Sequence, residues 1–216
     1  MSDPISVSRR LVAVFAADVE GYSRLMGADE VGTLKGLTER RAILDRFIGD
    51  HRGRIANTAG DSVLAEFGSA VDAVQCAVEA QAALAEANSN LPPDRRISFR
   101  IGVHIGDEMV RAGDLFGDGV NIAARLQSIA KPGSVCISGV TYDQVRKVLP
   151  MAFVDLGAQQ EIGEGQRLLA HAIEQKLTLT SSGAYEMLTE GSTKSVAQIG
   201  TYSGIARVLR YTFTLE

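Results

Sequence analysis

Cysteine, proline and tryptophan are all scarce in this chain of 216 residues. It has two cysteines, five prolines and no tryptophan, with an apolar fraction of 45% and a net charge of −4. This composition is typical of an ordinary globular protein and argues against an intrinsically disordered one. The two cysteines, Cys76 and Cys136, suit a reducing compartment, and we expect both to be small core residues.

Long apolar runs and a strong positive charge are also missing. The longest clean apolar run, residues 11–17, is far too short to span a bilayer, and the first ten residues lack the apolar core of a signal peptide. The mild acidity argues against broad non-specific binding to nucleic acid. We therefore expect a cytoplasmic protein with no membrane span and no nucleic-acid partner.

Several common catalytic motifs are absent as well. The chain has no P-loop, no nucleophile elbow and no dinucleotide fingerprint. Its histidines, His51, His104 and His171, have no partner at metal-ligand spacing. We interpret all three as structural or surface residues.

Hydrophobic patterns predict alternating strands and helices along residues 1–160. Strands are expected over residues 11–17, 97–105, 134–138 and 151–156, and a hairpin over 54–67 has its turn at Gly60-Asp61. Helices are expected from Asp29, from an N-cap at Ser69 and over residues 119–130, with a short one near Val145, and a loop is expected over 106–118. The order predicts an α+β fold, a ferredoxin-like βαββαβ core with additional αβ elements.

The last quarter of the chain has a different character. Residues 161–216 have scattered apolar positions and many glycines, serines and threonines, and residues 168–177 could form a helix. We expect a first domain over residues 1–160 and a C-terminal segment over 161–216 whose role the sequence does not reveal.

Two acidic residues follow strands that a βαββ arrangement places side by side. Asp18 comes at the exit of the first apolar strand, and Asp61 is at the tip of the hairpin turn. Two carboxylates in one place repel each other, and divalent cations neutralise such a pair well. The alternative is two unrelated, solvated turn carboxylates.

Asn121 and Arg125 are four residues apart on the predicted helix and so project from the same face. An amide beside a guanidinium is suited to a sugar oxygen and a phosphate. A solvated helix face is the simpler interpretation of this pair when it is taken alone. Asp114 lies just upstream, in the glycine-punctuated loop.

These signals occur together and in order. Phe15-Ala-Ala-Asp-Val-Glu-Gly-Tyr22, Asn57-Thr-Ala-Gly-Asp-Ser-Val-Leu-Ala-Glu-Phe67, Phe99-Arg-Ile-Gly-Val-His-Ile-Gly106 and Leu115-Phe-Gly-Asp-Gly-Val-Asn-Ile-Ala-Ala-Arg125 are the four motifs. With Pro132-Gly-Ser-Val-Cys-Ile-Ser138, they resemble the catalytic domain of class III adenylate and guanylate cyclases, in its bacterial branch. The resemblance covers residues 9–160, and the chain departs from the pattern after Gln160.

The resemblance implies a head-to-tail homodimer with nucleotide sites at the interface. Asp18 and Asp61, with the Val19 carbonyl, would hold two Mg²⁺ or Mn²⁺ ions. Asp114 would read the purine, Asn121 would orient the ribose and Arg125 would stabilise charge on the α-phosphate, all three from the partner subunit. The implied reaction is attack of the ribose 3′-hydroxyl on the α-phosphorus of ATP, giving cyclic AMP and pyrophosphate.

The base preference depends on two substrate-binding positions. Asn57 stands where adenylate cyclases usually carry a lysine that contacts adenine, and an amide can still donate to a ring nitrogen. An ionised Asp114 accepts from the amino group of adenine and repels the oxo group of guanine, which favours ATP. The alternatives are a guanylate cyclase and a catalytically silent nucleotide-binding or regulatory module.

Overall fold

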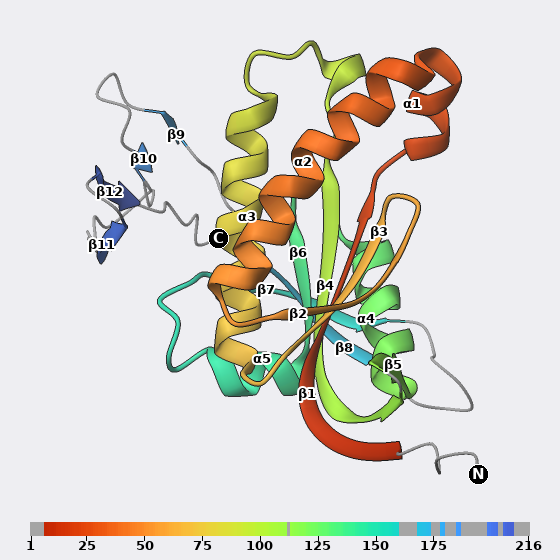
Figure 1. Ribbon diagram of the computed structural model, residues 1–216. Helices are drawn as coiled ribbons and strands as arrows, with labels where there is room; N and C mark the ends of the chain where they lie inside the picture. The colour runs from red at the N-terminus through yellow and green to blue at the C-terminus, as the bar shows by residue number, and fades with distance from the viewer. Residues whose placement is uncertain are drawn as a thin grey trace, which may run out of the picture.

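A computed structural model describes residues 7–111, 113–159 and 168–173, and the backbone of short strands at 178–179, 185–186, 198–202 and 205–209. The main sheet has the strand order β2-β3-β1-β4-β6-β8-β7, and β5 pairs with β4 (Figure 1). Its strands are β1 (Val7–Val19), β2 (Arg54–Ala59), β3 (Ser62–Phe67), β4 (Phe99–Arg111), β5 (Asp114–Phe116), β6 (Val135–Ser138), β7 (Val154–Gln159) and β8 (Leu168–Ile173). The helices are α1 (Tyr22–Ala28), α2 (Glu30–Asp50), α3 (Ala70–Asn88), α4 (Asp118–Ile129) and α5 (Gly139–Val145), with a 3₁₀ turn at Pro93–Arg95.

The order of elements confirms the predicted α+β fold. Among the pairings of the main sheet only β4 with β6 is parallel, and the others are antiparallel. A second sheet has the order β11-β12-β10-β9, from β9 (Thr178–Leu179), β10 (Tyr185–Glu186), β11 (Gln198–Tyr202) and β12 (Ile205–Leu209).

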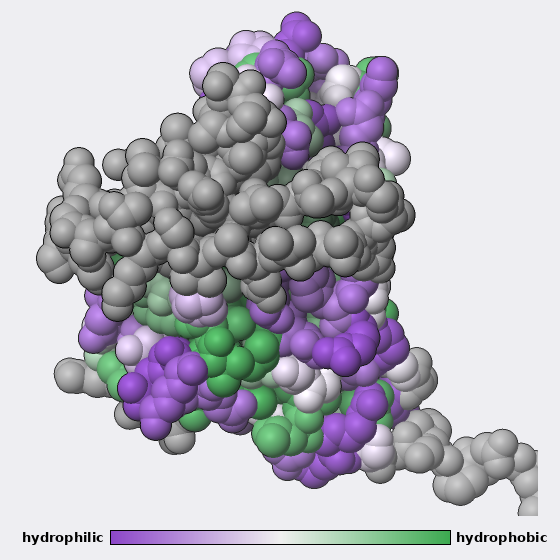
Figure 2. All heavy atoms as spheres, turned by 90° about the vertical axis from the view of Figure 1, so that its left-hand side faces the viewer, coloured by the Kyte–Doolittle hydropathy of each residue, from purple (hydrophilic) through white to green (hydrophobic). Residues whose placement is uncertain are grey.

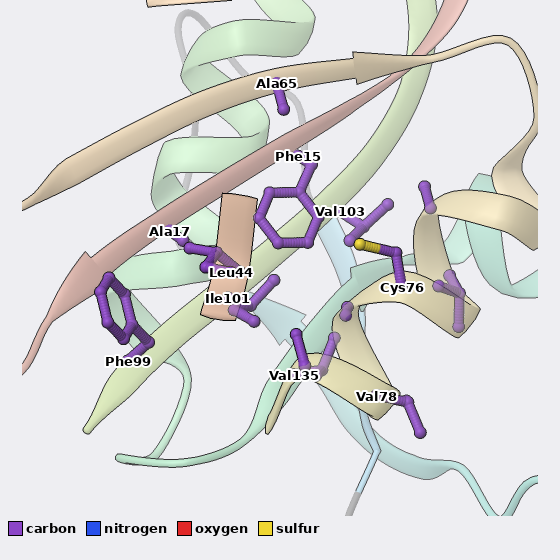
Figure 3. Close-up of a cluster of buried hydrophobic side chains, with 14 of the residues drawn as sticks. Phe15, Ala17, Leu44, Ala65, Cys76, Val78, Phe99, Ile101, Val103 and Val135 are labelled. Carbon is purple, nitrogen blue, oxygen red and sulfur yellow. The ribbon is translucent and has the colours of Figure 1, made fainter. Parts of the chain in front are cut away.

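Helices cover both faces of the main sheet, because β1 is apolar on both of its faces. Alternate residues of β1, such as Phe15, pack in the larger core with α2 and α3, while Val14 packs in a second cluster with Ala123 of α4. Figure 3 shows Phe15, Leu44 of α2 and Cys76 of α3 converging on the larger core. The continuous apolar run at residues 11–17 is therefore the signature of a strand buried on both sides.

The position of α4 depends on one glycine of β4. A Cβ atom at Gly102 would overlap the carbonyl oxygen of Ala123 and the backbone nitrogen of Gln127. The helix backbone therefore lies directly on the strand, which only a residue without a side chain permits. This close approach fixes the helix that carries Asn121 and Arg125 against the sheet.

Three local predictions were wrong. Residues 106–111 continue β4 instead of forming a loop, because they pair with β1 as far as Arg111 with Val7. Residues 168–173 form a strand, β8, and not the helix considered for 168–177; the run is too short for periodicity to separate the two. The short helix α1 lies in a stretch where no helix was expected.

Strand β8 lies between β6 and β7 in the main sheet. The sheet therefore includes residues that follow the expected boundary at Gln160. The reason is that β8 supplies pairing partners to both neighbours, with Cys136 opposite Ala172 and Val154 opposite the same alanine.

Within the described part of the chain, no helix is both long and apolar enough to cross a bilayer. The predicted buried cysteines are confirmed, with Cys76 at 0% and Cys136 at 1% exposure. α5 and the segment after it lie on the left of Figure 1, the side turned to the viewer in Figure 2, where hydrophobic and hydrophilic residues both lie at the surface outside the grey region. These residues include the exposed Val140 and Val148.

Candidate functional site

The hairpin of β2 and β3 brings Asp61 to the end of β1, next to Asp18. Ala17 pairs with Val63 across β1 and β3, so the turn at Gly60 and Asp61 projects beside the last residues of β1. Gly60 has a φ of +60°, a left-handed conformation that costs a residue with a side chain about 1–2 kcal/mol. Nothing lies within 4 Å of a Cβ built there, so the glycine serves the turn and not the packing.

The two carboxyl groups are in contact and are held by nearby donors. The Ser62 hydroxyl donates to Oδ1 of Asp18 at 2.8 Å, and the backbone N–H of Val19 donates to Oδ2 of Asp61 at 3.2 Å. Burial, followed by the hydrogen bond and the repulsion from Asp18, raises the pKa of Asp61. The pair is therefore electrostatically unfavourable when both groups are ionised, which is the condition that a divalent cation relieves.

Arg100 is a third member of this group that the sequence analysis did not single out. It lies directly opposite Asp18 in the pairing of β4 with β1, and its Nη2 is 3.3 Å from Oδ2 of Asp18. Its side chain is 25% exposed, and Nη1 also donates to the Ser128 carbonyl of α4. The available signal was its place on the polar side of a strictly alternating strand, but the register with β1 could not be read from the sequence.

The donor set around Asp18 suits a hard, oxygen-binding cation. Among the residues that the structure describes, no group of three or more His, Cys, Asp or Glu side chains could hold a metal. Mg²⁺ commonly takes only one or two protein carboxylates and completes its shell with water and substrate phosphate. Two adjacent carboxylates at a partly exposed sheet end fit this pattern, whereas they do not fit a closed zinc site.

The second group of predicted residues lies on α4 and β5. Asn121 and Arg125 are both exposed on α4, and Asp114 is the first residue of β5. In the described part of the chain, no hydrogen bond or ion pair joins their side chains to Asp18 or Asp61.

Asp114 is far from Asp18 along the sheet. It pairs with Arg111, and Arg111 pairs with Val7, at the opposite end of the 13-residue strand β1 from Asp18. Thirteen residues of strand span about 40 Å at the usual rise. Figure 1 shows β5 and the tip of the β2–β3 hairpin at opposite ends of β1. One chain alone therefore does not bring Asp114 to the acidic pair.

Asn57 lies on the outer strand of the hairpin. It is exposed, it pairs with Leu64, and the register of β2 against β3 shifts between Ile55 and Asn57. A bulge of this kind redirects side chains and is frequent beside functional sites. The cluster on the α4 side of the sheet includes the neighbouring Ala56, together with Leu115 of β5.

Comparison with known protein families shows which family this chain belongs to. The family described as the adenylate and guanylate cyclase catalytic domain matches residues 6–175. The chain belongs to this family. The match includes β8, so the similarity extends past Gln160, where the resemblance in the sequence motifs ends.

Relatives within the family carry adenylate cyclase names. A Rhizobium meliloti protein named "Putative adenylate cyclase 3" is 50% identical over 153 residues, which are 70% of this chain and 26% of the relative. A Streptomyces coelicolor protein named adenylate cyclase is 34% identical over 140 residues, 62% of this chain and 34% of the relative. The chain thus spans about a quarter to a third of the length of these two proteins.

Solved structures of the family share the fold. The adenylate/guanylate cyclase/hydrolase from Silicibacter pomeroyi has a TM-score of 0.70 and 38% identity, over 77% of this chain and 97% of that one. The adenylyl cyclase CyaB from P. aeruginosa has a TM-score of 0.68 and 20% identity, over 80% of this chain and 97% of that one. At 20% identity the second comparison supports the architecture alone.

Proposed function

We propose that this domain is an adenylate cyclase, which converts ATP to 3′,5′-cyclic AMP and pyrophosphate. The observation that carries the proposal is the contact of Asp18 and Asp61 at the end of β1. The names of the relatives from Rhizobium meliloti and Streptomyces coelicolor support the choice of reaction.

In this proposal Asp18, Asp61 and the Val19 carbonyl hold two divalent ions, Mg²⁺ or Mn²⁺. Such ions, when bound, lower the pKa of the ribose 3′-hydroxyl and neutralise the triphosphate. Their positive charge would also offset the repulsion between the carboxylates of Asp18 and Asp61. The hydrogen bonds from Ser62 and from the Val19 N–H orient the two carboxylates that would hold the ions.

Arg100 gives the site a cation of its own. It pairs with Asp18 at 3.3 Å, and its buried Nε has no hydrogen-bond partner among the described residues. A metal held by Asp18 would compete with this ion pair, and the Arg100 guanidinium would then be available to a phosphate oxygen. Arg is well suited to this task because its planar fork of donors matches phosphate oxygens.

Asn121 and Arg125 complete the site from a second copy of the chain. Their exposure on α4, and the separation of Asp114 from Asp18 along β1, are what a shared interface site requires. Asn121 orients the ribose, Arg125 stabilises the charge that develops on the α-phosphate, and the 3′-oxygen attacks in line with the departing pyrophosphate. A homodimer of this kind has two equivalent sites.

In this proposal, Asn57 and Asp114 determine whether the site prefers adenine or guanine. Asp114 accepts from the amino group of adenine, and Asn57 donates to a ring nitrogen without adding charge. We expect ATP to be preferred over GTP, by a smaller margin than a lysine at position 57 would give.

The decisive experiment is a cyclase assay with Mn²⁺ and with ATP or GTP, at two protein concentrations. We expect cyclic AMP formation that rises faster than in proportion to protein, because the sites form only in the dimer. Asp61→Ala is the negative control. Product from GTP alone would replace the adenylate by a guanylate cyclase. Nucleotide binding in calorimetry without any turnover would identify a silent binding module. The absence of both turnover and binding would refute a nucleotide site.

We keep the cytoplasm as the expected compartment. Both cysteines are free and buried, and burial raises the pKa of Cys136 to about 11, so its thiol stays protonated and unreactive.

A further inference from the structure

A buried carboxyl group lies beneath the first turn of α4. Glu108 of β4 is 1% exposed, although it is flanked by exposed residues on both sides. Its carboxylate accepts a hydrogen bond from the backbone N–H of Gly119. The other oxygen, Oε2, has no hydrogen-bond partner among the described residues. Burying a carboxyl group with an unpaired oxygen is energetically unfavourable, so we expect the buried position of Glu108 to serve a specific role.

The loop that leads into α4 is shaped around this carboxyl. A Cβ atom at Gly117 or at Gly119 would overlap an oxygen of Glu108, and one at Gly106 would lie 2.6 Å from Oε1. Gly117 also has a φ of +148°, which favours glycine. The backbone at these three glycines therefore approaches the carboxyl as closely as glycine alone allows.

α4 lacks the local cap that the longer helices before it possess. α2 and α3 each begin with a side chain that accepts from the backbone of the first turn, Asp29 and Ser69 respectively. The N-cap of α4 is Gly117, which has no side chain to offer. The first N–H groups of a helix need an acceptor. Glu108 supplies one from the neighbouring strand.

His104 closes the other side of the carboxyl. It lies on the same face of β4, and its Nε2 is 3.2 Å from the Cβ position of Gly106. Its Nδ1 is 2.9 Å from Oγ of Ser138, and burial lowers the pKa of this histidine to about 4, so it is neutral. Burial also raises the pKa of Glu108. Asp107 and Asp118 are the nearby acids and Arg9 the nearby base.

We propose that Glu108 is a positioning residue, which caps α4 from β4 and thereby fixes Asn121, two residues after Gly119, for the reaction. This inference rests on the proposed cyclase function for its kinetic consequence. Its structural part, the cap itself, is independent of that function. The helix dipole adds to the hydrogen bond by favouring a carboxylate at this end.

Two variants of similar size separate the cap from simple packing. Glu108→Gln keeps an oxygen that can accept from the Gly119 N–H, whereas Glu108→Met fills the same space without any acceptor. We expect kcat of Glu108→Met to fall about tenfold or more, and that of Glu108→Gln to stay within about threefold. The concentration of Mn²⁺ at half-maximal activity stays within about twofold in both, because Asp18 and Asp61 are held by other elements.

Hydrogen exchange tests the cap without any activity. In Glu108→Met the amides of residues 119–121 are expected to exchange about five- to tenfold faster than in the native chain. Those of Glu108→Gln remain near the native rate, as do the amides of residues 61–67 in both variants. Equal exchange of residues 119–121 in the two variants would overturn the proposal. If the native chain has no cyclase activity, the proposed function fails while exchange still decides the cap.

Mixing of subunits gives an independent readout. A shared site takes Asp61 from one chain and α4 from the other, so Glu108→Met mixed with Asp61→Ala restores one intact site per mixed dimer. We expect activity to exceed the sum of the two variants measured separately. No recovery on mixing, with both chains folded by circular dichroism, would mean that Glu108 acts on the fold as a whole and not on the α4 half of the site.

Discussion

Replacing Asp61 with asparagine should make the metal-free protein more stable while it abolishes catalysis. The amide oxygen of asparagine can still accept from the Val19 N–H, which lies 3.2 Å from Oδ2 in the native chain. The substitution removes the charge whose burial and whose repulsion from Asp18 raise the pKa of this carboxyl. In the proposed function these two carboxylates bind cations, so without cations they repel each other, and the variant removes that repulsion.

The size of the effect follows from the same contacts. The interaction of two charges at a partly exposed site is commonly worth about 0.2–1 kcal/mol. We therefore expect the free energy of unfolding to rise by up to about 1 kcal/mol at pH 7. For a domain of this length that is an increase of about 2–4 °C in Tm.

With divalent ions and a nucleotide analogue bound, the native chain should become more stable than Asp61→Asn. At a concentration of metal and nucleotide analogue about 100 times Kd, the native chain gains about 2.7 kcal/mol, or roughly 5–11 °C. Asp61→Asn, with one carboxylate fewer, gains much less. The assay is thermal denaturation of both proteins with EDTA, and again with Mn²⁺ and a non-cyclising ATP analogue.

The control is Ser62→Ala, which removes the donor to Oδ1 of Asp18 and leaves both charges in place. We expect it to lower the metal-free stability and to keep most of the metal effect. The reasoning is refuted if Asp61→Asn is the less stable protein in EDTA, or if Mn²⁺ and the analogue stabilise it as much as the native chain.

Three further predictions concern other parts of the molecule. His51 is 3.4 Å from Glu79, which raises its pKa above 6.5, so its stabilising charge is fully present below pH 6.5 and is lost as the pH rises through the raised value. The free energies of unfolding in urea at pH 5.5 and 8.5 should differ by about 0.5–1 kcal/mol more in the native chain than in Glu79→Gln. Gly102→Ala should lower Tm by about 4–8 °C, because the new methyl group meets the α4 backbone, and should lower kcat with it; an unchanged Tm would show that α4 can move away. Arg125→Ala and Asp61→Ala, each inactive alone, should give about a quarter of native cyclase activity when mixed in equal amounts, and no recovery would exclude a shared site.

The pattern of apolar residues was sufficient to predict most of the sheet and its helices. The run at residues 11–17 has no polar interruption, and such a run fits only a strand covered on both faces. Ser69 before an apolar helix pattern predicted a cap, and its hydroxyl does accept from the backbone of Asp72. These features are local, so the sequence contains them in full.

The apolar pattern did not predict strands whose conformation depends on pairing with neighbouring strands and not on a regular alternation of residues. Residues 106–111 have no regular alternation, yet β4 continues there because β1 offers a partner along its whole length. β8 is too short for its period to be read, and its neighbours β6 and β7 decide its conformation.

For the candidate site, the sequence determined which residues are chemically able to act: the acids Asp18 and Asp61, and the pair Asn121 and Arg125 that one helical turn places on a common face. The predicted βαββ order already placed Asp18 beside Asp61, but only the tertiary structure decided which other residues meet this pair. Strand register put Arg100 against Asp18, and the same register put Asp114 at the far end of β1. Register is a long-range property, since it is set by contacts between segments far apart in the chain. That is why residue types could be named from the sequence, while the contact of Arg100 with Asp18 and the separation of Asp114 from Asp18 could be seen only in the fold.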